Sequence, residues 1–580
     1  MAKRPGSRGL LVAVFVVVGF AAAGLFVALL LAGGGELPWV RHPVLHIDLD
    51  GPVVEIAPRD PIAEMLGRRR LSMRDLLDGL EKASEDHAIE GLLLDIGSPS
   101  LGWAQIEELR EAIRRFRENG KWATAYLDTA GELGGGNGIY LLATACDRIV
   151  LAPPGDVGLT GLRIETPFVR GLLDKLGVEP QFGQRKEFKN AVNVFTSRDY
   201  TPAHREATER LLDSLFASLV EGVASGRGLT PERVRELIDG GPYTSAEALE
   251  AGLVDEVAYR DEVLAKIESD TGSDDPLVPL QRYLRSGRPH AAGGHKIAVV
   301  YAVGQIALGR SRKLPTGLRV MGSETMTRAL RRAREDRSVE AVVLRVDSPG
   351  GSYVASDLIR REVELTKREK PVIVSMGNVA ASGGYFISMH ADRILADTDT
   401  LTGSIGVYAG KFVTRRFWRD KLGINFGGIQ RGANAEMMSS QEPFDERARA
   451  RLEALLDRIY DDFVTKAAEG RGMTPEELEP LARGRVWTGR DALERGLVDE
   501  IGGLQRAIAV AAERAGIPEG AAIAIEVLPR PQTFLEALLD GNDDTLAALP
   551  AGAREALDEL VFATEPGERW LFDPDLPRVR

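Results

Sequence analysis

The sequence predicts an α/β protein that consists of two tandem copies of one domain, preceded by a single N-terminal transmembrane helix. Two pairs of segments carry the duplication: SGRGLTPE (225–232) returns as EGRGMTPE (469–476), and YTSAEALEAGLVDE (243–256) returns as WTGRDALERGLVDE (487–500). The offset is 244 residues in both pairs, far more than the about 20–50 residues of a solenoid unit, so a whole domain is duplicated. Within each copy, short apolar runs alternate with amphipathic helical patterns, which indicates the α/β class.

An apolar segment at 10–32 predicts the transmembrane helix. It contains 23 residues without a charge. At about 1.5 Å per residue, a helix of that length spans a hydrocarbon core of about 30 Å. Three basic residues lie in the preceding segment, 1–9, which is expected to stay in the cytoplasm while the rest of the chain faces outward. The main alternative is a signal peptide cleaved near 32–35, although such peptides have shorter apolar runs of about 7–15 residues.

A linker is expected at 33–42 and the first domain at 43–284. The domain opens with VLHIDLDGPVVEI, whose alternation of apolar and polar residues is typical of a strand. Strands that alternate with helices favour a parallel sheet with right-handed crossovers. In chain order, the patterns predict helix 73–86, strand 89–96, helix 104–120, strand 121–127 and strand 148–152.

After a polar linker at 285–295, the second domain is expected at 296–525 with the same order of elements. A tail at 526–580 has no counterpart in the first copy and shows two amphipathic helical patterns, at 533–540 and 551–562. In the second domain, strands are predicted at 296–304, 339–346, 370–377 and 392–397, and helices at 323–337 and 446–472.

The composition excludes several classes of function. The formal net charge of −13 and the pI of about 5.3 argue against nucleic-acid binding, which requires a basic face. The seven histidines and the single cysteine, Cys146, show no metal-ligand spacing, so neither a metal nor a cofactor is expected. The glycine-rich segment at 131–138 lacks the Lys-Ser/Thr of a phosphate-binding P-loop, which argues against nucleotide binding.

Two chemistry-bearing residues stand out where the copies differ. In the second copy, VAASGGYF places Ser382 among small residues directly after a predicted strand, and an offset of 245 puts Asn137 there in the first copy. In the first copy, Lys189 lies opposite Ala435 of the second at an offset of 246. One copy keeps a lysine and the other a serine, as expected of a Ser–Lys pair split across the duplication, although random divergence would give the same pattern.

The position of Ser382 favours a nucleophile. A serine on a glycine-rich strand-to-helix turn exposes its Oγ beside backbone N–H groups. The N–H of Gly383 and one from the glycines of SPGG (348–351), Gly351 among them, would flank an oxyanion there. One such donor is worth about 3–4 kcal/mol in an acyl-transfer transition state. The alternative interpretation is a glycine-rich turn with a helix-capping serine.

No histidine lies on an obvious turn after a predicted strand, so a Ser–His–Asp triad stays open as an alternative without support from the sequence. His390 follows the serine by eight residues, about 12 Å along a helix, which is out of reach. A lysine can serve if its pKa falls from about 10.4 to about 7, a shift that requires about 4.6 kcal/mol. Desolvation and neighbouring cations lower a lysine pKa. Lys189 lies in an apolar segment, and Arg185 and Lys186 are expected to add like charge.

Ser404, in LTGSIGV (401–407), is a third candidate. Its hydroxyl would hold and orient the lysine amine, as the third member of a catalytic triad orients the base. Its counterpart in the first copy lies near Leu159. The alternative is an ordinary turn serine.

At these residues the chain resembles the signal peptide peptidase A family in its long, duplicated, membrane-anchored form. The motifs SPGG (348–351), ASGGYF (381–386), LTGSIGV (401–407) and FKNAV (188–192) agree with that family in order and spacing. The resemblance covers about residues 43–515 and leaves the tail outside. It implies two tandem crotonase/ClpP-like domains built from stacked ββα units.

The resemblance also implies a Ser–Lys serine endopeptidase. Long members of the family form tetramers on the periplasmic side of the bacterial inner membrane and degrade the hydrophobic remnants of signal peptides. One departure is local, because FKNAVNVF carries Asn190 and Asn193 beside the lysine. The implied roles are Ser382 as nucleophile, Lys189 as general base, Ser404 as the residue that orients the lysine, and the N–H groups of Gly351 and Gly383 as oxyanion hole.

Two alternatives come from other classes. One is a non-catalytic oligomeric scaffold at the membrane. The other is hydratase or isomerase chemistry on an acyl-CoA, which would use a carboxylate such as Asp347, directly before SPGG. Labelling of Ser382 by a fluorophosphonate would discriminate a serine hydrolase from both.

Overall fold

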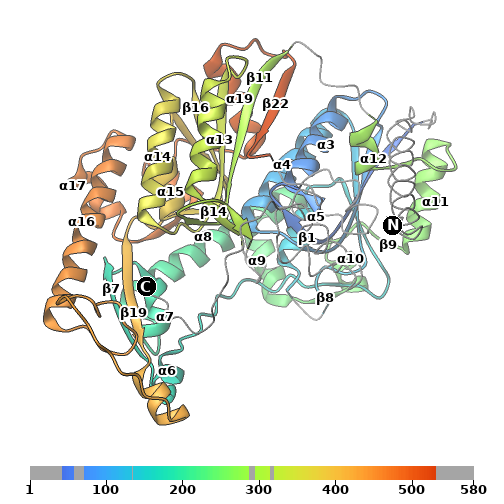
Figure 1. Ribbon diagram of the computed structural model, residues 1–580. Helices are drawn as coiled ribbons and strands as arrows, with labels where there is room; N and C mark the ends of the chain where they lie inside the picture. The colour runs from blue at the N-terminus through green and yellow to red at the C-terminus, as the bar shows by residue number, and fades with distance from the viewer. Residues whose placement is uncertain (1–41, 58–70, 133–134, 287–293, 314–318, 531–580) are drawn as a thin grey trace, which may run out of the picture. The chain divides into compact units, whose positions relative to one another are not determined.

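The computed structural model describes residues 42–57, 71–132, 135–286, 294–313 and 319–530 (Figure 1). The predicted transmembrane helix at 10–32 and the two helical patterns of the tail lie outside these ranges. Among the helices within the described ranges, none is both long and apolar enough to cross a membrane. The predicted α/β class is confirmed, because strands and helices alternate along both halves of the chain.

The first half contains a parallel sheet in the order β10-β1-β3-β4-β5-β9. Leu92 and Leu94 of β3 belong to one apolar core, and Leu93 belongs to another. Both faces of β3 are therefore covered, which explains its continuous apolar run. The elements are β1 (Val44–Val54), α3 (Met73–Glu85), β3 (Gly91–Ser100), α4 (Trp103–Glu118), β4 (Trp122–Leu127), α5 (Asn137–Ala143), β5 (Arg148–Leu151), β9 (Glu256–Val257) and β10 (Leu277–Pro279).

The second half repeats this plan in a sheet of order β20-β18-β16-β15-β11-β22, with β17 also paired to β16. All these pairs are parallel except β18 with β20. The last strand, β22, runs across residue 525, where the second domain was expected to end. The elements are β11 (His295–Val303), α13 (Ser323–Glu335), β15 (Ala341–Ser348), α14 (Tyr353–Lys367), β16 (Val372–Ala381), α15 (Gly383–Ser388), β17 (Arg393–Ala396), β18 (Leu401–Gly403), β20 (Val486–Thr488), α19 (Leu504–Ala515) and β22 (Ile523–Leu528).

The duplicated GRG motif marks the end of one long helix in each half. Helix α8 (Pro202–Arg227) and helix α16 (Glu446–Arg471) both contain 26 residues. Gly228 and Gly472 follow them in the left-handed conformation, with φ of 64° and 65°. This C-cap conformation favours glycine because it carries no Cβ penalty. The two helices therefore correspond to each other residue by residue at the offset of 244.

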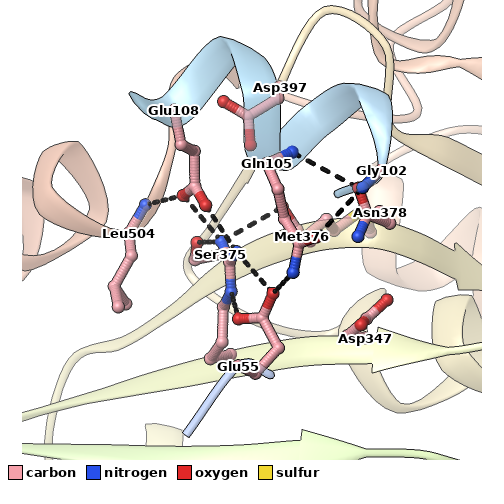
Figure 2. A network of polar contacts seen from close by, with 12 residues as sticks. Glu55, Gly102, Gln105, Glu108, Asp347, Ser375, Met376, Asn378, Asp397 and Leu504 are labelled. Carbon is pink, nitrogen blue, oxygen red and sulfur yellow. Dashed lines mark hydrogen bonds and ion pairs between the residues drawn. The ribbon is translucent and has the colours of Figure 1, made fainter. Parts of the chain in front are cut away.

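A buried ion-pair network joins the two halves (Figure 2). Arg345 of β15 is fully buried and lies 2.9 Å from Glu55 Oε2 and 2.6 Å from Glu108 Oε2, both from the first half. Gln105 donates to Glu55 and the Leu504 backbone N–H donates to Glu108, at 2.9 Å and 2.6 Å. Each buried carboxylate thus has several donors, which the loss of water requires.

Candidate active site

An extension of the first half reaches the second half. We call residues 177–192 the first arm. Its strand β7 (Glu179–Arg185) pairs antiparallel with β19 (Val407–Val413), so that Arg185 lies opposite Val407 and Glu179 opposite Val413. The two strands run side by side in Figure 1, next to α16.

Aromatic packing holds the first arm on β19. The ring of Phe412, on β19, lies 5.1 Å from the ring of Phe182 and 5.3 Å from the ring of Phe195. Both contacts are edge-to-face, an arrangement worth about 0.5–1.5 kcal/mol per pair beyond the buried area. The arm therefore has an apolar anchor as well as its ladder of backbone hydrogen bonds.

The end of the first arm turns against a glycine of the second half. The backbone N–H groups of Lys186 and Phe188 donate to the carbonyl of Arg483 at 3.2 Å and 3.1 Å. Gly484 follows with φ +82°, and a Cβ built on it would lie 2.6 Å from Lys189 Cβ. A side chain at position 484 would therefore displace Lys189. This contact was not predicted from the sequence, because its signal is a single glycine far from Lys189 in the chain.

The structure brings Lys189, Ser382 and Ser404 together within one chain. Lys189 Nζ lies 3.1 Å from Ser382 Oγ, 2.9 Å from Ser404 Oγ and 2.7 Å from the carbonyl oxygen of Ser404. A neutral amine has two N–H groups and one lone pair. Two donations to Ser404 would leave the lone pair facing Ser382, which is the arrangement that a general base requires.

Burial lowers the pKa of Lys189 from its ordinary value of 10.5 to about 7. Its side chain is only 4% exposed. The expected contribution of like charge was wrong, because the neighbouring cations are neutralised. Arg185 pairs with Glu453 at 2.8 Å and with Asp457 at 2.5 Å, and Lys186 Nζ lies 3.0 Å from a carboxylate oxygen of Glu479.

Ser382 occupies a strained turn between β16 and α15. Its φ is 55°, in the left-handed region that non-glycine residues rarely adopt. The turn is fixed by a hydrogen bond from the Ser382 N–H to the carbonyl of Gly403, at 2.8 Å. Ser404 also has a positive φ, 51°. Strain of this kind costs about 1–3 kcal/mol per residue and concentrates at functional sites.

The N–H groups of Gly351 and Gly383 lie beside this turn. Gly383 begins helix α15, so its N–H has no acceptor within the helix. Gly351 forms a bridge to Ile306, but the two hydrogen bonds of that bridge use the carbonyl of Gly350 and the N–H of Ser352. The Gly351 N–H therefore points away from Ile306. A Cβ built on Gly383 would lie 3.1 Å from that nitrogen, so the two donors are close neighbours.

The first half has an asparagine, hydrogen-bonded to a neighbouring loop, at the position that corresponds to Ser382. Asn137 stands where the second half has its serine. Its side-chain nitrogen donates to the carbonyl of Gly161 at 2.9 Å, and its oxygen accepts the N–H groups of Thr160 and Gly161, both at 3.1 Å. These bonds fix a loop and leave no nucleophile at this position.

His390 and Asp347, the other side chains considered for acid–base chemistry, have hydrogen-bond partners of their own. His390 lies 2.8 Å from the carbonyl of Lys466 and 3.0 Å from Glu364. Asp347 accepts the N–H of Val379 at 3.1 Å, and burial raises the pKa of its carboxyl group to about 6.

Comparison with known proteins places the chain among proteases. The family model described as "Peptidase family S49" matches residues 115–273 and 364–518, one region in each half. The chain is 34% identical to "Serine protease SPPA, chloroplastic" of Arabidopsis thaliana, over 88% of this chain and 76% of that protein. It is 30% identical to "Protease 4" of Salmonella typhi, over 96% of this chain and 94% of that protein. A solved structure of a ClpP1 mutant from Listeria monocytogenes matches 36% of this chain and 94% of its own at 14% identity, with a TM-score of 0.25 that is too low to support a conclusion about the fold.

Proposed function

The chain belongs to peptidase family S49 and is a serine protease, and from this membership we propose that Ser382 is its nucleophile and Lys189 its general base. The hydrogen bond of 3.1 Å between Lys189 Nζ and Ser382 Oγ carries the proposal. The lowered pKa of Lys189, about 7, supports it, because a base must be neutral to accept a proton.

The proposed reaction proceeds through an acyl-enzyme. Lys189 takes the proton of Ser382 Oγ as this oxygen attacks the peptide carbonyl carbon, and the N–H groups of Gly351 and Gly383 stabilise the oxyanion. The protonated lysine then gives its proton to the leaving amine as the C–N bond breaks. In the second half-reaction, Lys189 takes a proton from water as the water oxygen attacks the ester carbon. The bond from that carbon to Ser382 Oγ then breaks, the protonated lysine returns its proton to Ser382 Oγ, and the peptide leaves as its carboxylic acid. Ser404 holds the amine in place throughout.

The proposed substrates are the hydrophobic remnants of cleaved signal peptides. The motifs shared with the signal peptide peptidase A family support this assignment. We further propose that residues 10–32 anchor the chain in the bacterial inner membrane, that each half has a crotonase/ClpP-like fold on the periplasmic side, and that four copies assemble. The motif match and the apolar N-terminal segment support these points.

Substitution of the two proposed catalytic side chains tests the assignment. Ser382→Ala and Lys189→Met should each lower kcat on a fluorogenic apolar peptide by about 10³-fold or more, because removal of one member disables the unit. A fluorophosphonate should label Ser382 in the unsubstituted protein and nothing in Ser382→Ala. Lys189→Met should still fold, since methionine fills a buried position without a charge to desolvate.

Two matched variants serve as controls. Ser388→Ala removes a buried hydroxyl of the same helix, α15, which donates to the carbonyl of Gly384 at 2.7 Å. Lys370→Met removes another lysine whose pKa burial lowers. Both should retain hydrolysis. Full activity in either Ser382→Ala or Lys189→Met would refute the assignment.

A further inference from the structure

The duplication leaves one arm undocked. At the offset of 246, the first arm (177–192) corresponds to residues 423–438, which we call the second arm. No strand forms in it, and Ile429 is 93% exposed, Met438 59% and Phe426 56%. By contrast Val192, which corresponds to Met438, is 2% exposed in the docked first arm. The second arm therefore presents apolar side chains to solvent, and at the position of Met438 its counterpart buries a valine.

The root of the second arm is held to its own half. Lys411 Nζ donates to the carbonyl of Met437 at 2.9 Å, and the Thr414 N–H donates to the carbonyl of Ser440 at 2.7 Å. These bonds fix where the arm leaves the domain and leave the stretch around Ile429 exposed.

The segment of the first half that corresponds to β19 also has no strand paired with it in the described part of the chain. Strand β19 corresponds, at the offset of 245, to residues 162–168, which we call the free edge. These residues form no ladder within the described part of the chain, and Ile164 is 39% exposed. The first arm and β19 thus pair inside the chain, whereas the second arm and the free edge form no strand pair within the described residues. The side chain of Thr166, in the free edge, accepts a hydrogen bond from Tyr200 at 2.7 Å.

The charged residues that hold the first arm on the second half have counterparts in the second arm and in the first half. In the docked arm, Arg185 bonds to Glu453 and Asp457 of α16. The residue that corresponds to Arg185 in the second arm is Arg431, which is exposed.

The residues of α8 that correspond to Glu453 and Asp457, at the offset of 244, are Glu209 and Asp213, and both are exposed. An arginine on the arm and two carboxylates one helical turn apart on the long helix are therefore present twice. Only one of the two sets is joined within the chain.

We propose that the second arm of one copy docks on the free edge of a second copy of this chain, in the antiparallel register of β7 and β19. The register carried over at the repeat offsets puts Ile429 opposite Ile164 and brings Arg431 to Glu209 and Asp213 of the neighbour. This inference rests on the proposed assembly and specifies its contact. Each copy gives one arm and receives one, so the interface is head-to-tail and closes a ring when the rotation permits.

The contact adds no second active site. Ala435 of the second arm stands at the position of Lys189, and Asn137 stands at the position of Ser382. Each copy therefore keeps one reactive pair within its own chain, and the contact between copies only assembles the particle.

Disulfide trapping between two different variants tests the docking. One preparation carries Ile164→Cys and the other Ile429→Cys, each full-length, with distinct tags and in a Ser382→Ala background. Cys146 is buried and stays unreactive. After mixing under mild oxidation, we expect a crosslinked pair that carries both tags, at a yield at least about tenfold above that of Leu308→Cys mixed with Ile429→Cys. Leu308 is a matched control because it is 54% exposed and lies outside the free edge.

Charge exchange tests the register. Arg431→Glu added to the Ile429→Cys chain should lower the crosslink yield, and Glu209→Lys with Asp213→Lys in the Ile164→Cys partner should restore it. If the crosslink yield of Ile164→Cys with Ile429→Cys equals that of the Leu308 control, the proposed docking is wrong. If Arg431→Glu does not change the yield, the proposed register is wrong. Because every chain carries Ser382→Ala, these results do not depend on hydrolysis; the proposed catalytic roles can fail while the trapping succeeds, and the reverse.

Discussion

Lys189 differs from an ordinary lysine because it is buried and, among the described residues, no carboxylate bonds to its amine. Its partners are the hydroxyl groups of Ser382 and Ser404 and one carbonyl. These groups do not offset the cost of burying a charge, so burial alone lowers the pKa to about 7. About half of such lysines are neutral at pH 7, against fewer than about one in a thousand for a lysine in water.

The pH dependence of hydrolysis follows from this titration. The neutral amine is the proposed base, and the protonated amine dominates below the folded-state pKa of about 7. We therefore expect kcat/KM to rise about tenfold per unit below pH 7 and to level off above it. Rates measured on a fluorogenic peptide between about pH 5.5 and 8.5 check this, and Lys189→Arg should be inactive throughout because guanidinium does not deprotonate.

Asp399 supplies the control for this profile. Burial raises the pKa of its carboxyl group to about 7 as well, and it accepts a hydrogen bond from Ser218 at 2.6 Å. Asp399→Asn should keep the inflection near pH 7. If the inflection disappears in Asp399→Asn, or if the unsubstituted protein shows a flat profile, the assignment of the titration to Lys189 is wrong.

The first arm is the element that brings Lys189 of the first half to Ser382 of the second half. Strand β7 pairs with β19, and the arm ends where Lys186 and Phe188 bond to Arg483. Lys189 is only 4% exposed in the docked arm, so we expect the position of the arm and the pKa of Lys189 to be linked. Loosening the arm should therefore alter the chemistry as well as the stability.

Phe412→Ala tests that link. The substitution removes the ring that packs on Phe182 and Phe195, and we expect a loss of stability of about 2 kcal/mol. Water that reaches Lys189 should raise its pKa, so kcat/KM should fall at pH 7 and its inflection should move to higher pH. Tyr408→Ala, at a 46% exposed position of the same strand, should leave the inflection in place. An unmoved inflection in Phe412→Ala would mean that the arm does not control the titration.

At the scale of the whole molecule, Arg345 joins the halves whose residues meet at the active site. Its guanidinium bonds to Glu55 and Glu108, which lie 290 and 237 residues away in the chain. The same apolar core contains residues of both halves, Leu94 and Val343 among them. The two copies should therefore unfold together, because neither can separate without exposing this core and these charges.

Arg345→Met should lower the free energy of unfolding by about 3–5 kcal/mol, because it leaves two buried carboxylates without their cation. Glu55→Gln and Glu108→Gln in the Arg345→Met chain should recover part of the loss. Denaturant titration followed by fluorescence measures both. Arg332→Met, which breaks an exposed pair with Glu526, is the control and should cost less than about 1 kcal/mol. A loss in Arg345→Met as small as that of the control would show that the network does not hold the halves together.

The sequence was sufficient for features that depend on neighbours along the chain. The apolar runs that predicted strands became β3, β4 and β5 in the first half, since burial on both faces requires such runs, and the alternating segment at its start became β1. Alignment of the two copies identified Lys189 and Ser382 as candidates, because each is a reactive side chain that the other copy lacks at the corresponding position.

Tertiary structure alone decided how those residues meet. Lys189 and Ser382 are 193 residues apart, and they lie 3.1 Å apart because the first arm docks on β19 and on Arg483. The like charge expected from Arg185 and Lys186 was wrong because their acidic partners come from more than 260 residues further along the chain. The periodicity of a sequence shows on which face of an element a residue lies. The burial of an amine and the charges around it depend on segments that are far from it in the chain, so the local sequence does not reveal them.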